Sequence, residues 1–174
     1  YILLAVGGWP YIPEFPGSQY ALSSNEMFFL ERLPETAVVV GGGYIALEFA
    51  GILNGLGVST HLIYRGQRLL KSFDSEMTDK VEQGMRSKGV KIHLNTKVDS
   101  IEFVNESHDV FLSDGRCVSA DLVLYATGRR ANTNHLGLEN TSVKTRHDGS
   151  IIVDKDFRTH EPSIFALGDV IDRV

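Results

Sequence analysis

The chain has 174 residues, of which 43% are hydrophobic and 22% are charged, a balance typical of a soluble globular protein. Its net charge of −5 offers no general attraction to nucleic acid or to an anionic lipid surface. No apolar run approaches the roughly 18 residues that a membrane span requires. We therefore expect neither nucleic acid nor a membrane as a partner.

One cysteine, Cys117, occurs in the sequence. A single thiol excludes an internal disulfide framework and is typical of a reducing compartment, so we expect a cytoplasmic protein. The sequence opens at Tyr1 directly on the apolar run YILLAVGG, without an initiating methionine. We therefore expect it to be a piece of a longer protein, which leaves a targeting peptide before Tyr1 open.

The first forty residues predict two short strands and one short helix, separated by a linker. Residues 1–5 form an apolar run typical of a buried strand. Three prolines within residues 7–17 prevent regular pairing and indicate a linker that crosses the surface. The capping box Ser23-x-x-Glu26 precedes an apolar cluster and predicts a short helix, and residues 37–40 then predict a short buried strand.

A helix and a second strand follow at once, so that strand, helix and strand occupy about thirty residues, the length of one βαβ unit. The helix begins at Tyr44 and ends near Gly57, and residues 59–64 form the second strand. A second helix at residues 75–88 and a third strand at residues 90–94 continue the alternation. Apolar positions at helical spacing give each helix one apolar face: Ile45, Phe49, Ile52, Leu53 and Leu56 in the first, and Met77, Val81 and Met85 in the second.

Three short segments of alternating character come next, at residues 98–104, 109–113 and 116–120. Alternation with period two is typical of strands that are buried on one face. Asp114-Gly115 lies between the last two segments and predicts a two-residue hairpin turn. The three segments therefore predict an antiparallel meander attached to the parallel sheet.

The last third of the chain is less regular. Residues 121–128 predict another buried strand, and residues 129–163 predict loops with one strand at residues 150–154. Residues 163–174 predict a strand that turns at Gly168. The predicted fold class is α/β: a Rossmann-like parallel sheet with a βαβ nucleotide-binding unit and an antiparallel three-stranded meander.

The stretch VVVGGGYIALEFA places three glycines between a buried strand and a helix. In the pattern Gly41-x-Gly43-x-x-Ala46, Gly41 permits the tight turn, Gly43 lets a pyrophosphate approach the backbone, and Ala46 keeps the helix close to the sheet. The helix N-terminus adds N–H donors and the positive end of a dipole. A turn that serves packing alone is the alternative, which the βαβ context disfavours.

The type of dinucleotide depends on the end of the second strand, where an NAD site usually carries an acid about 20 positions after the glycines. Here Tyr64 takes that place, and no carboxylate occurs between Val58 and Phe73. Arg65, Arg68 and Lys71 instead predict a site for the 2′-phosphate of NADP. A solvated basic loop is the alternative. Alanine at positions 46 and 50, in place of glycine, is a weaker indication in favour of NADP.

Tyr44 and Glu48 lie four residues apart and share one face of the helix close to the glycine turn. Glu48 is an acid within an apolar stretch, and burying it without a partner would be costly. It either faces the nicotinamide or a lysine of another domain, or it is an exposed acid of the helix. The six histidines show no metal-ligand spacing, and no metal site is expected.

Four motifs in order resemble one known family, the flavin-dependent pyridine nucleotide-disulfide oxidoreductases, and within it the glutathione reductase branch. They are LLAVGGWPYIPEFPG, VVVGGGYIALEFAGILNGLG, YATGRRANT and IFALGDV. They correspond to the crossing out of the flavin domain, the NADPH turn and helix, the return motif and the second flavin contact. The resemblance covers essentially the whole chain. Lipoamide dehydrogenases are less similar, because their second strand typically ends in an acid.

The resemblance assigns roles to individual residues. Tyr44 matches a tyrosine that covers the flavin and swings aside for the nicotinamide. Arg129 matches a residue at the flavin edge, and Asp169, beside Gly168, matches an aspartate that binds the flavin's ribityl and pyrophosphate portion. Positions that match NADPH contacts are Gly41, Gly43, Ile45, Glu48, Arg65, Lys71 and Gly128. Because Lys71 stands where the branch usually has a second arginine, Arg68 is expected to share the 2′-phosphate contact.

The resemblance also implies a domain plan and a reaction. Residues 1–20 would end a segment of the FAD domain and cross over, residues 21–130 would form the NADPH-binding domain, and residues 131–174 would return to the FAD domain. Hydride would pass from NADPH to FAD and then to a redox-active cysteine pair outside this sequence, reducing a small disulfide, glutathione disulfide first, in a homodimer. The alternatives are a related flavoprotein with another acceptor and a nucleotide-binding module without catalysis.

Overall fold

The computed structural model describes residues 1–171 and divides the chain into two compact units. One unit contains residues 11–128, and the other combines residues 1–10 with the chain from Arg129 onward. The last three residues of the predicted run 163–174 lie outside the described residues. Each unit is described by itself below. Their assignment to a nucleotide domain and a flavin domain stays a prediction.

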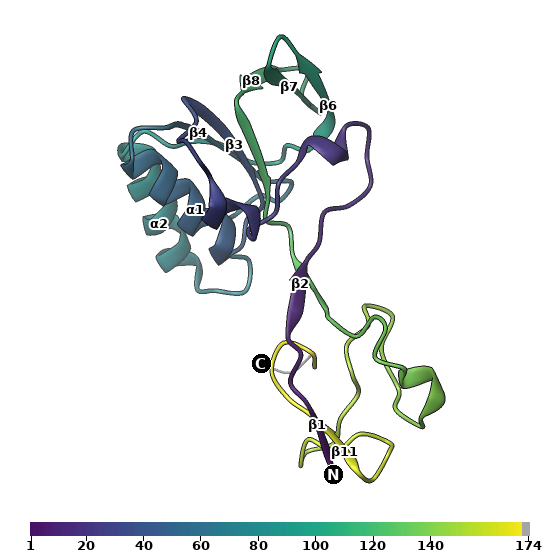
Figure 1. Cartoon of the computed structure of the whole chain (residues 1–174). Helices are drawn as coiled ribbons and strands as arrows, with labels where there is room; N and C mark the ends of the chain where they lie inside the picture. The colour runs from purple at the N-terminus through teal and green to yellow at the C-terminus, as the bar shows by residue number, and fades with distance from the viewer. Residues whose placement is uncertain (172–174) are drawn as a thin grey trace. The chain divides into compact units, whose positions relative to one another are not determined.

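The larger unit is built on a four-stranded parallel sheet (Figure 1). Its strands are β3 (Thr36–Val40), β4 (Ser59–Ile63), β5 (Lys91–His93) and β9 (Leu122–Tyr125), in the order β5-β4-β3-β9. Helices α1 (Tyr44–Gly55) and α2 (Ser75–Ser87) lie side by side on one face of it. β3, α1 and β4 form the predicted βαβ unit, because β3 and β4 are parallel neighbours. The predicted fold class is confirmed.

An antiparallel sheet covers the other face of the parallel sheet. It consists of β6 (Val98–Val104), β7 (Ser107–Leu112) and β8 (Cys117–Ala120), in the order β6-β7-β8. Successive residues of β3 point to opposite faces, so Val39 packs under the helices and Val38 packs against the meander. Because both faces are covered, β3 is almost entirely buried, as its unbroken apolar run predicted.

The predicted hairpin around Asp114-Gly115 forms, because β7 and β8 pair antiparallel, but its loop is longer than the predicted two residues. β7 ends at Leu112 and β8 begins at Cys117, so four residues separate them, and Gly115 takes φ of 84°. Within this loop Arg116 pairs with the carboxylate of Asp114. The two-residue turn lies instead between β6 and β7, at Asn105-Glu106, where φ is 50° and 63°. Two successive positive φ angles match the right-handed twist of a hairpin.

Both helices are present, but their predicted apolar faces are only partly the buried ones. In α1 the residues against the sheet are Ala46, Leu47, Ala50 and Leu53, whereas Ile52 is 55% exposed and Leu56 is also exposed. Small alanines bring the helix close to the sheet, and this close packing decides which side faces inward. In α2, Thr78 is buried while Met77 and Val81 are exposed. No helix within residues 1–171 is long and apolar enough to cross a membrane.

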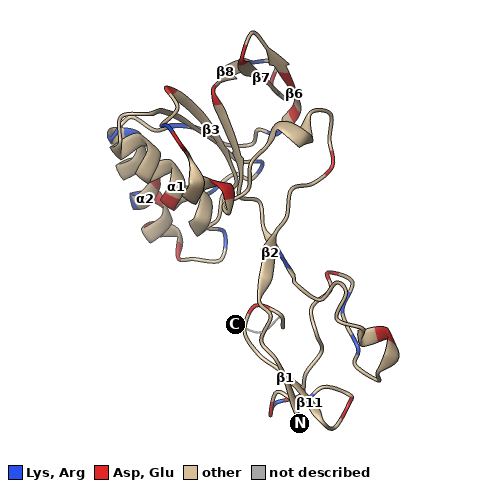
Figure 2. Ribbon diagram, in the orientation of Figure 1, with Lys and Arg blue, Asp and Glu red and all other residues tan. Residues whose placement is uncertain are grey.

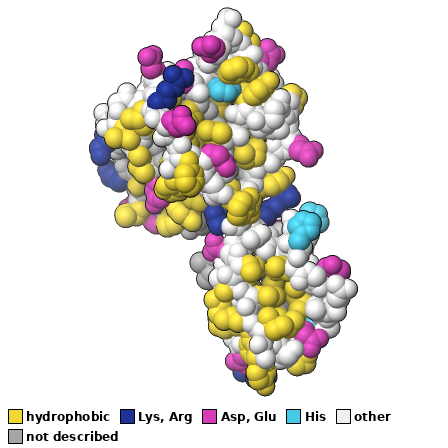
Figure 3. Space-filling view, viewed as in Figure 1, with side chains coloured by type: hydrophobic (Ala, Val, Ile, Leu, Met, Phe, Trp, Pro, Cys, Tyr) yellow, Lys and Arg dark blue, Asp and Glu magenta, His cyan; other side chains and the backbone are white. Residues whose placement is uncertain are grey.

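The segment before β3 contains two single turns of 3₁₀ helix, η1 (Ser18–Tyr20) and η2 (Glu26–Phe29). The predicted capping contact forms, because Ser23 donates to the Glu26 carboxylate from its hydroxyl at 2.6 Å and from its backbone at 2.7 Å. These hydrogen bonds lower the pKa of Glu26. A full helix does not follow. Phe28 and Phe29 remain exposed, and apolar side chains of this kind are spread over the face drawn in Figure 3.

The smaller unit contains two short two-stranded sheets and the 3₁₀ turn η3 (Leu138–Asn140). β1 (Ile2–Leu4) pairs in parallel with β11 (Ile164–Ala166), and β2 (Gly8–Pro10) pairs antiparallel with β10 (Arg129–Ala131). A core of Ile151, Ala166, Val170 and Ile171 holds the unit together.

Three predictions for the smaller unit need correction. β1 is a strand but is not buried, since Ile2 is 54% and Leu3 59% exposed. Residues 8–10 do pair, because Pro10 lies at the end of β2, where its missing N–H interrupts no ladder. Residues 150–154 form no strand, and the only pairing there is an isolated bridge between Thr145 and Ile151.

Two histidines meet on neighbouring strands of the parallel sheet. Nδ1 of His61 lies 3.2 Å from Nε2 of His93, and Nε2 of His61 lies 3.3 Å from the ammonium of Lys91. Burial, with help from the nearby charge of Lys91, lowers the pKa of His61 to about 4, and burial lowers the pKa of His93 as well. Both rings are therefore neutral at neutral pH.

This pair predicts a pH dependence of stability. The pKa of His61 rises from about 4 in the folded chain to about 6.5 on unfolding, so the unfolded chain gains protons first. The stabilisation is complete above pH 6.5 and is lost as the pH falls towards 4. The full shift equals about 3 kcal/mol, which solvent screening of a half-exposed ring reduces to about 1 kcal/mol.

Urea unfolding between pH 7.5 and pH 4.5 measures this effect. His61→Asn should flatten the decrease in unfolding free energy, whereas His160→Asn, a matched change at an exposed position, should not. Equal slopes for the native protein and His61→Asn would contradict the prediction.

Candidate nucleotide-binding site

The turn between β3 and α1 depends on Gly41. Its φ is 147°, and a Cβ added there would lie 2.3 Å from the carbonyl oxygen of Ala126 and 3.0 Å from the Cβ of Ala46. The Gly41 N–H donates to the carbonyl of Ile63, at the end of β4. Only glycine accepts both this conformation and this close approach of backbone and helix.

Gly43 faces open space. It is the N-cap of α1, with φ −89° and ψ 175°, it is exposed, and a Cβ added there would meet no atom within 4 Å. Within residues 1–171, no side-chain hydrogen bond caps the N-terminus of α1. The first N–H groups of a twelve-residue helix therefore point at solvent, in an arrangement that favours an anion. Ala46, in contrast, is fully buried against the sheet.

The three predicted cations lie in the segment after β4, residues 64–71, which we call the cation loop. Its backbone is tied to the glycine turn, because Leu70 donates its N–H to the carbonyl of Gly42 at 2.7 Å. Leu69 is fully buried in the core. The loop therefore lies directly beside the turn, and the basic residues of this part of the chain are coloured in Figure 2.

The cations differ in their surroundings. Arg65 and Lys71 are exposed, whereas Arg68 is half-buried. Among the residues that the structure describes, the Nε atom of Arg68 is buried and has no hydrogen-bond partner. An unsatisfied guanidinium N–H is costly to bury, so a ligand oxygen at this position would be stabilising. Charge and geometry together make the loop a suitable place for a phosphate.

Sequence reasoning overlooked Gly42. A Cβ at this position would lie 2.6 Å from three ring atoms of Tyr64, so the middle glycine of the turn is needed for close contact with the tyrosine ring. The motif pattern leaves that position unspecified, and only the run of three glycines could have signalled it.

Three predicted residues lie on α1. Tyr44 is its first residue and is 58% exposed, Ile45 is half-buried, and Glu48 is exposed one turn further along. The exposed position of Glu48 is compatible with both alternatives given above. It can be an exposed acid of the helix, or an acid that faces the nicotinamide or a lysine of another domain. Tyr44 and Glu48 therefore lie near the turn without lining a closed site.

Two other predicted residues meet in the smaller unit. Nε of Arg129 lies 3.3 Å from a carboxylate oxygen of Asp169, forty positions away, and Arg129 also donates to the carbonyl of Gly8. A Cβ on Gly8 would lie 3.1 Å from the carbonyl oxygen of Arg130 and in ordinary contact, at 3.5 Å, with Nε of Arg129 and Cβ of Asp169. Gly168, with φ of 78°, makes the turn that carries Asp169.

Gly128 belongs to the larger unit. Its φ is 154°, a conformation that side-chain-bearing residues rarely adopt, and a Cβ there would meet no atom within 4 Å. Its backbone carbonyl accepts from the N–H of Tyr11.

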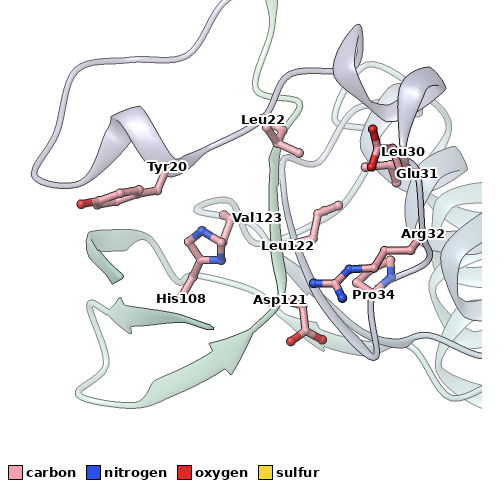
Figure 4. Close-up of a pocket in the computed structure, with 10 residues that line it drawn as sticks. All are labelled: Tyr20, Leu22, Leu30, Glu31, Arg32, Pro34, His108, Asp121, Leu122 and Val123. Atoms are coloured by element: carbon pink, nitrogen blue, oxygen red, sulfur yellow. The ribbon is translucent and has the colours of Figure 1, made fainter. Parts of the chain in front are cut away.

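A cavity of about 580 Å³ lies elsewhere in the larger unit (Figure 4). It adjoins the amino end of β9, whereas the glycine turn follows the carboxyl end of β3. None of the predicted site residues lines it. The lining residues are Tyr20, Leu22, Leu30, Glu31, Arg32, Pro34, His108, Asp121, Leu122 and Val123.

The parallel sheet, the glycine turn and the exposed helix N-terminus define a dinucleotide-binding protein of the α/β class. Comparison with known proteins gives the family. A family model described as pyridine nucleotide-disulphide oxidoreductase matches residues 1–174, and the chain belongs to that family. Its members are flavoproteins that use FAD and NAD(P)H.

Curated relatives match almost the whole chain. It is 40% identical to a glutathione reductase of Nostoc and 41% identical to the chloroplastic/mitochondrial glutathione reductase of Pisum sativum, over 99% and 100% of its length. It is 35% identical to a trypanothione reductase of Trypanosoma congolense, over its full length. The chain spans 40%, 32% and 36% of these relatives, respectively.

Solved structures agree with the fold. An HOCl-induced flavoprotein disulfide reductase from Escherichia coli superposes with a TM-score of 0.93 at 27% identity, covering 99% of this chain and 40% of that one. An engineered water-forming NADPH oxidase, solved with NADPH bound, gives a TM-score of 0.86 at 29% identity, covering 97% of this chain and 39% of that one.

Proposed function

We propose that the chain is the NADPH-binding part of a flavoprotein that reduces a low-molecular-weight disulfide, glutathione disulfide first. One observation carries the choice of NADPH: the cation loop is tied to the glycine turn, and it has Tyr64 where an acid would select NADH. Arg65, Arg68 and Lys71 are thereby held beside the turn that would receive the pyrophosphate.

The engineered NADPH oxidase supports this choice. It carries an aspartate replaced by alanine and two changes to arginine, the first directly after that aspartate. The two new arginines of the oxidase are separated by the same number of residues as Arg65 and Lys71. The oxidase also carries a glycine-to-alanine change, which precedes its first new arginine by the same number of residues that separates Ala46 from Arg65. The protein that carries these changes is an NADPH oxidase with NADPH bound.

The residues present fit the proposed coenzyme. Gly43 leaves open space at the helix N-terminus for a pyrophosphate, and the half-buried Arg68 has an N–H without a partner. Arg65 would supply a bidentate fork to the 2′-phosphate, and Lys71 a point charge.

When bound, NADPH supplies a hydride and FAD relays the electrons, so that the overall reaction is NADPH + H⁺ + disulfide → NADP⁺ + two thiols. The chain's own residues would bind and orient the two cofactors. Tyr44 would shield the flavin until the nicotinamide arrives, and Glu48 would orient the nicotinamide end. Arg129 and Asp169, already paired at 3.3 Å, would hold the flavin.

The names of the relatives support a choice of acceptor. Two of those compared are glutathione reductases, which makes glutathione disulfide the first acceptor to test. We also propose a homodimer, as the family resemblance implies. Similarity to a trypanothione reductase makes trypanothione disulfide the second acceptor to test.

Anaerobic stopped-flow mixing tests this function. The native protein, loaded with FAD, should lose flavin absorbance rapidly with NADPH and at least about tenfold more slowly with NADH at equal concentration. Addition of glutathione disulfide should then restore the oxidised spectrum and release two thiols per NADPH. If the flavin is bleached but no disulfide reoxidises it, the proposed disulfide acceptor is wrong. If the flavin is not bleached, the alternative of a nucleotide-binding module without catalysis is favoured.

A further inference from the structure

We infer that the ring of Tyr64 is a positioning residue, and that it sets coenzyme preference by fixing the distance between the glycine turn and the cation loop. This inference rests on the proposed function, because it concerns how the loop presents its cations to a 2′-phosphate. In this arrangement the tyrosine acts through the loop and need not touch the phosphate itself.

The ring is enclosed by two glycines. A Cβ on Gly42 would lie 2.6 Å from Cγ, Cδ2 and Cε2 of the ring, and a Cβ on Gly66 would lie 2.5 Å from Cε1, 2.8 Å from Cζ and 2.9 Å from the hydroxyl oxygen. Gly42 belongs to the turn and Gly66 to the cation loop. The ring therefore fills the space between these two segments.

Conformation does not explain the two glycines. Gly42 and Gly66 are absent from the residues with positive φ, so a side chain would be compatible with their backbone angles. What excludes a side chain at either position is the tyrosine ring. The three residues therefore form one packed unit in which each depends on the others.

The backbone of Tyr64 is fixed independently of its ring. Its N–H donates to the carbonyl of His93, and its carbonyl accepts from the N–H of Thr96. Removing the ring should therefore leave residue 64 in place at the carboxyl end of β4 and open a gap on either side. The turn and the loop would then be free to approach each other.

Three other residues of the loop hold it in place, and we call them its anchors; they lie between its cations in the sequence. Gly66 accepts from the N–H of Asn95, Leu69 is buried, and Leu70 is bonded to the turn. Arg65, Arg68 and Lys71 each sit next to one of these anchors in the sequence. A change in the spacing set by Tyr64 would shift all three cations relative to a bound pyrophosphate, and binding that depends on several simultaneous contacts is sensitive to such shifts.

Calorimetric titration of the native protein with NADP⁺ and NAD⁺ tests the inference without relying on turnover. Tyr64→Leu should raise the Kd for NADP⁺ about tenfold and change the Kd for NAD⁺ less than twofold. Tyr64→Phe, the matched control that keeps the ring, should leave both constants unchanged. Thermal unfolding of each variant checks that it is folded.

A double-mutant cycle supplies the second readout. Gly66→Ala pushes against the ring from the other side and should raise the Kd for NADP⁺ about tenfold alone, but less than twofold in the Tyr64→Leu background. If the fold-changes in Kd caused by Gly66→Ala and Tyr64→Leu simply multiply in the double variant, the inference is wrong. Equal losses for both coenzymes would also overturn it, as would a Tyr64→Phe variant as weak as Tyr64→Leu, which would mean that the hydroxyl contacts the ligand.

The outcomes separate this inference from the proposed function. If the native protein binds NAD⁺ and NADP⁺ equally, the proposed function fails and the inference fails with it. If the native protein prefers NADP⁺ and Tyr64→Leu keeps that preference, only the inference fails.

Discussion

Replacement of Arg65 by alanine is expected to weaken binding of NADPH by about 1.5 to 3 kcal/mol, or about 10- to 150-fold in Kd, while binding of NADH changes little. Arg65 is the first residue after Tyr64 in the loop that is bonded to the glycine turn. The loss is selective because only NADPH carries the 2′-phosphate that a guanidinium would pair with. Competitive titration of both coenzymes on the native protein measures the two constants.

Arg32→Ala is the matched control. It removes the same side chain from an exposed position in the same unit, beside the cavity at the amino end of β9 and not at the glycine turn. Its effect on both coenzymes should be less than about twofold. Equal weakening of NADPH and NADH by Arg65→Ala would remove Arg65 from the 2′-phosphate site.

The second large effect is expected at Gly43. A valine there has an allowed backbone conformation and meets no atom of the chain, but valine is a poorer N-cap than glycine, so stability should fall by less than about 1 kcal/mol and the melting temperature by about 2–4 °C. The new side chain would occupy the space where a pyrophosphate approaches the helix N-terminus. Both coenzymes should bind at least about tenfold more weakly. Calorimetry on the folded variant provides the measurement.

Gly41→Ala distinguishes the role of the glycine turn in folding from its proposed role in coenzyme binding. Its φ of 147° and the carbonyl of Ala126 at 2.3 Å should cost about 1–3 kcal/mol of folding stability. A Gly43→Val variant that loses stability to the same degree, or that binds either coenzyme normally, would contradict the role assigned to Gly43.

Sequence patterns identified the elements whose signals are local. The apolar run of β3, the periodicity of α1 and the alternation of the meander each predicted an observed element, because backbone geometry imposes these periods on any chain that is buried on one side or both. The same patterns misjudged burial. Ile52 and Met77 fit the period of their helices and yet lie exposed. Period alone does not reveal which face a neighbouring layer covers.

The short elements were the least predictable. β2 and β10 pair residues 8–10 with residues 129–131, and no pattern within either segment indicates a partner more than a hundred positions away. The predicted strand at residues 150–154 has the right composition but finds only one bridge. Strand formation requires a neighbour with free hydrogen-bonding groups, and that neighbour is supplied by the fold.

By itself the sequence determined the class of ligand, a dinucleotide, because glycines between a strand and a helix are a feature that this segment carries locally. The cations that follow in place of an acid are also a local feature, and they predict which dinucleotide binds. Only the tertiary structure decided that these segments meet. The hydrogen bond from Leu70 to Gly42 and the ring of Tyr64 between two glycines bring the cation loop to the glycine turn. The physical reason is that contacts between distant segments depend on packing volume and on parallel strand order, neither of which can be read from a single stretch of residues.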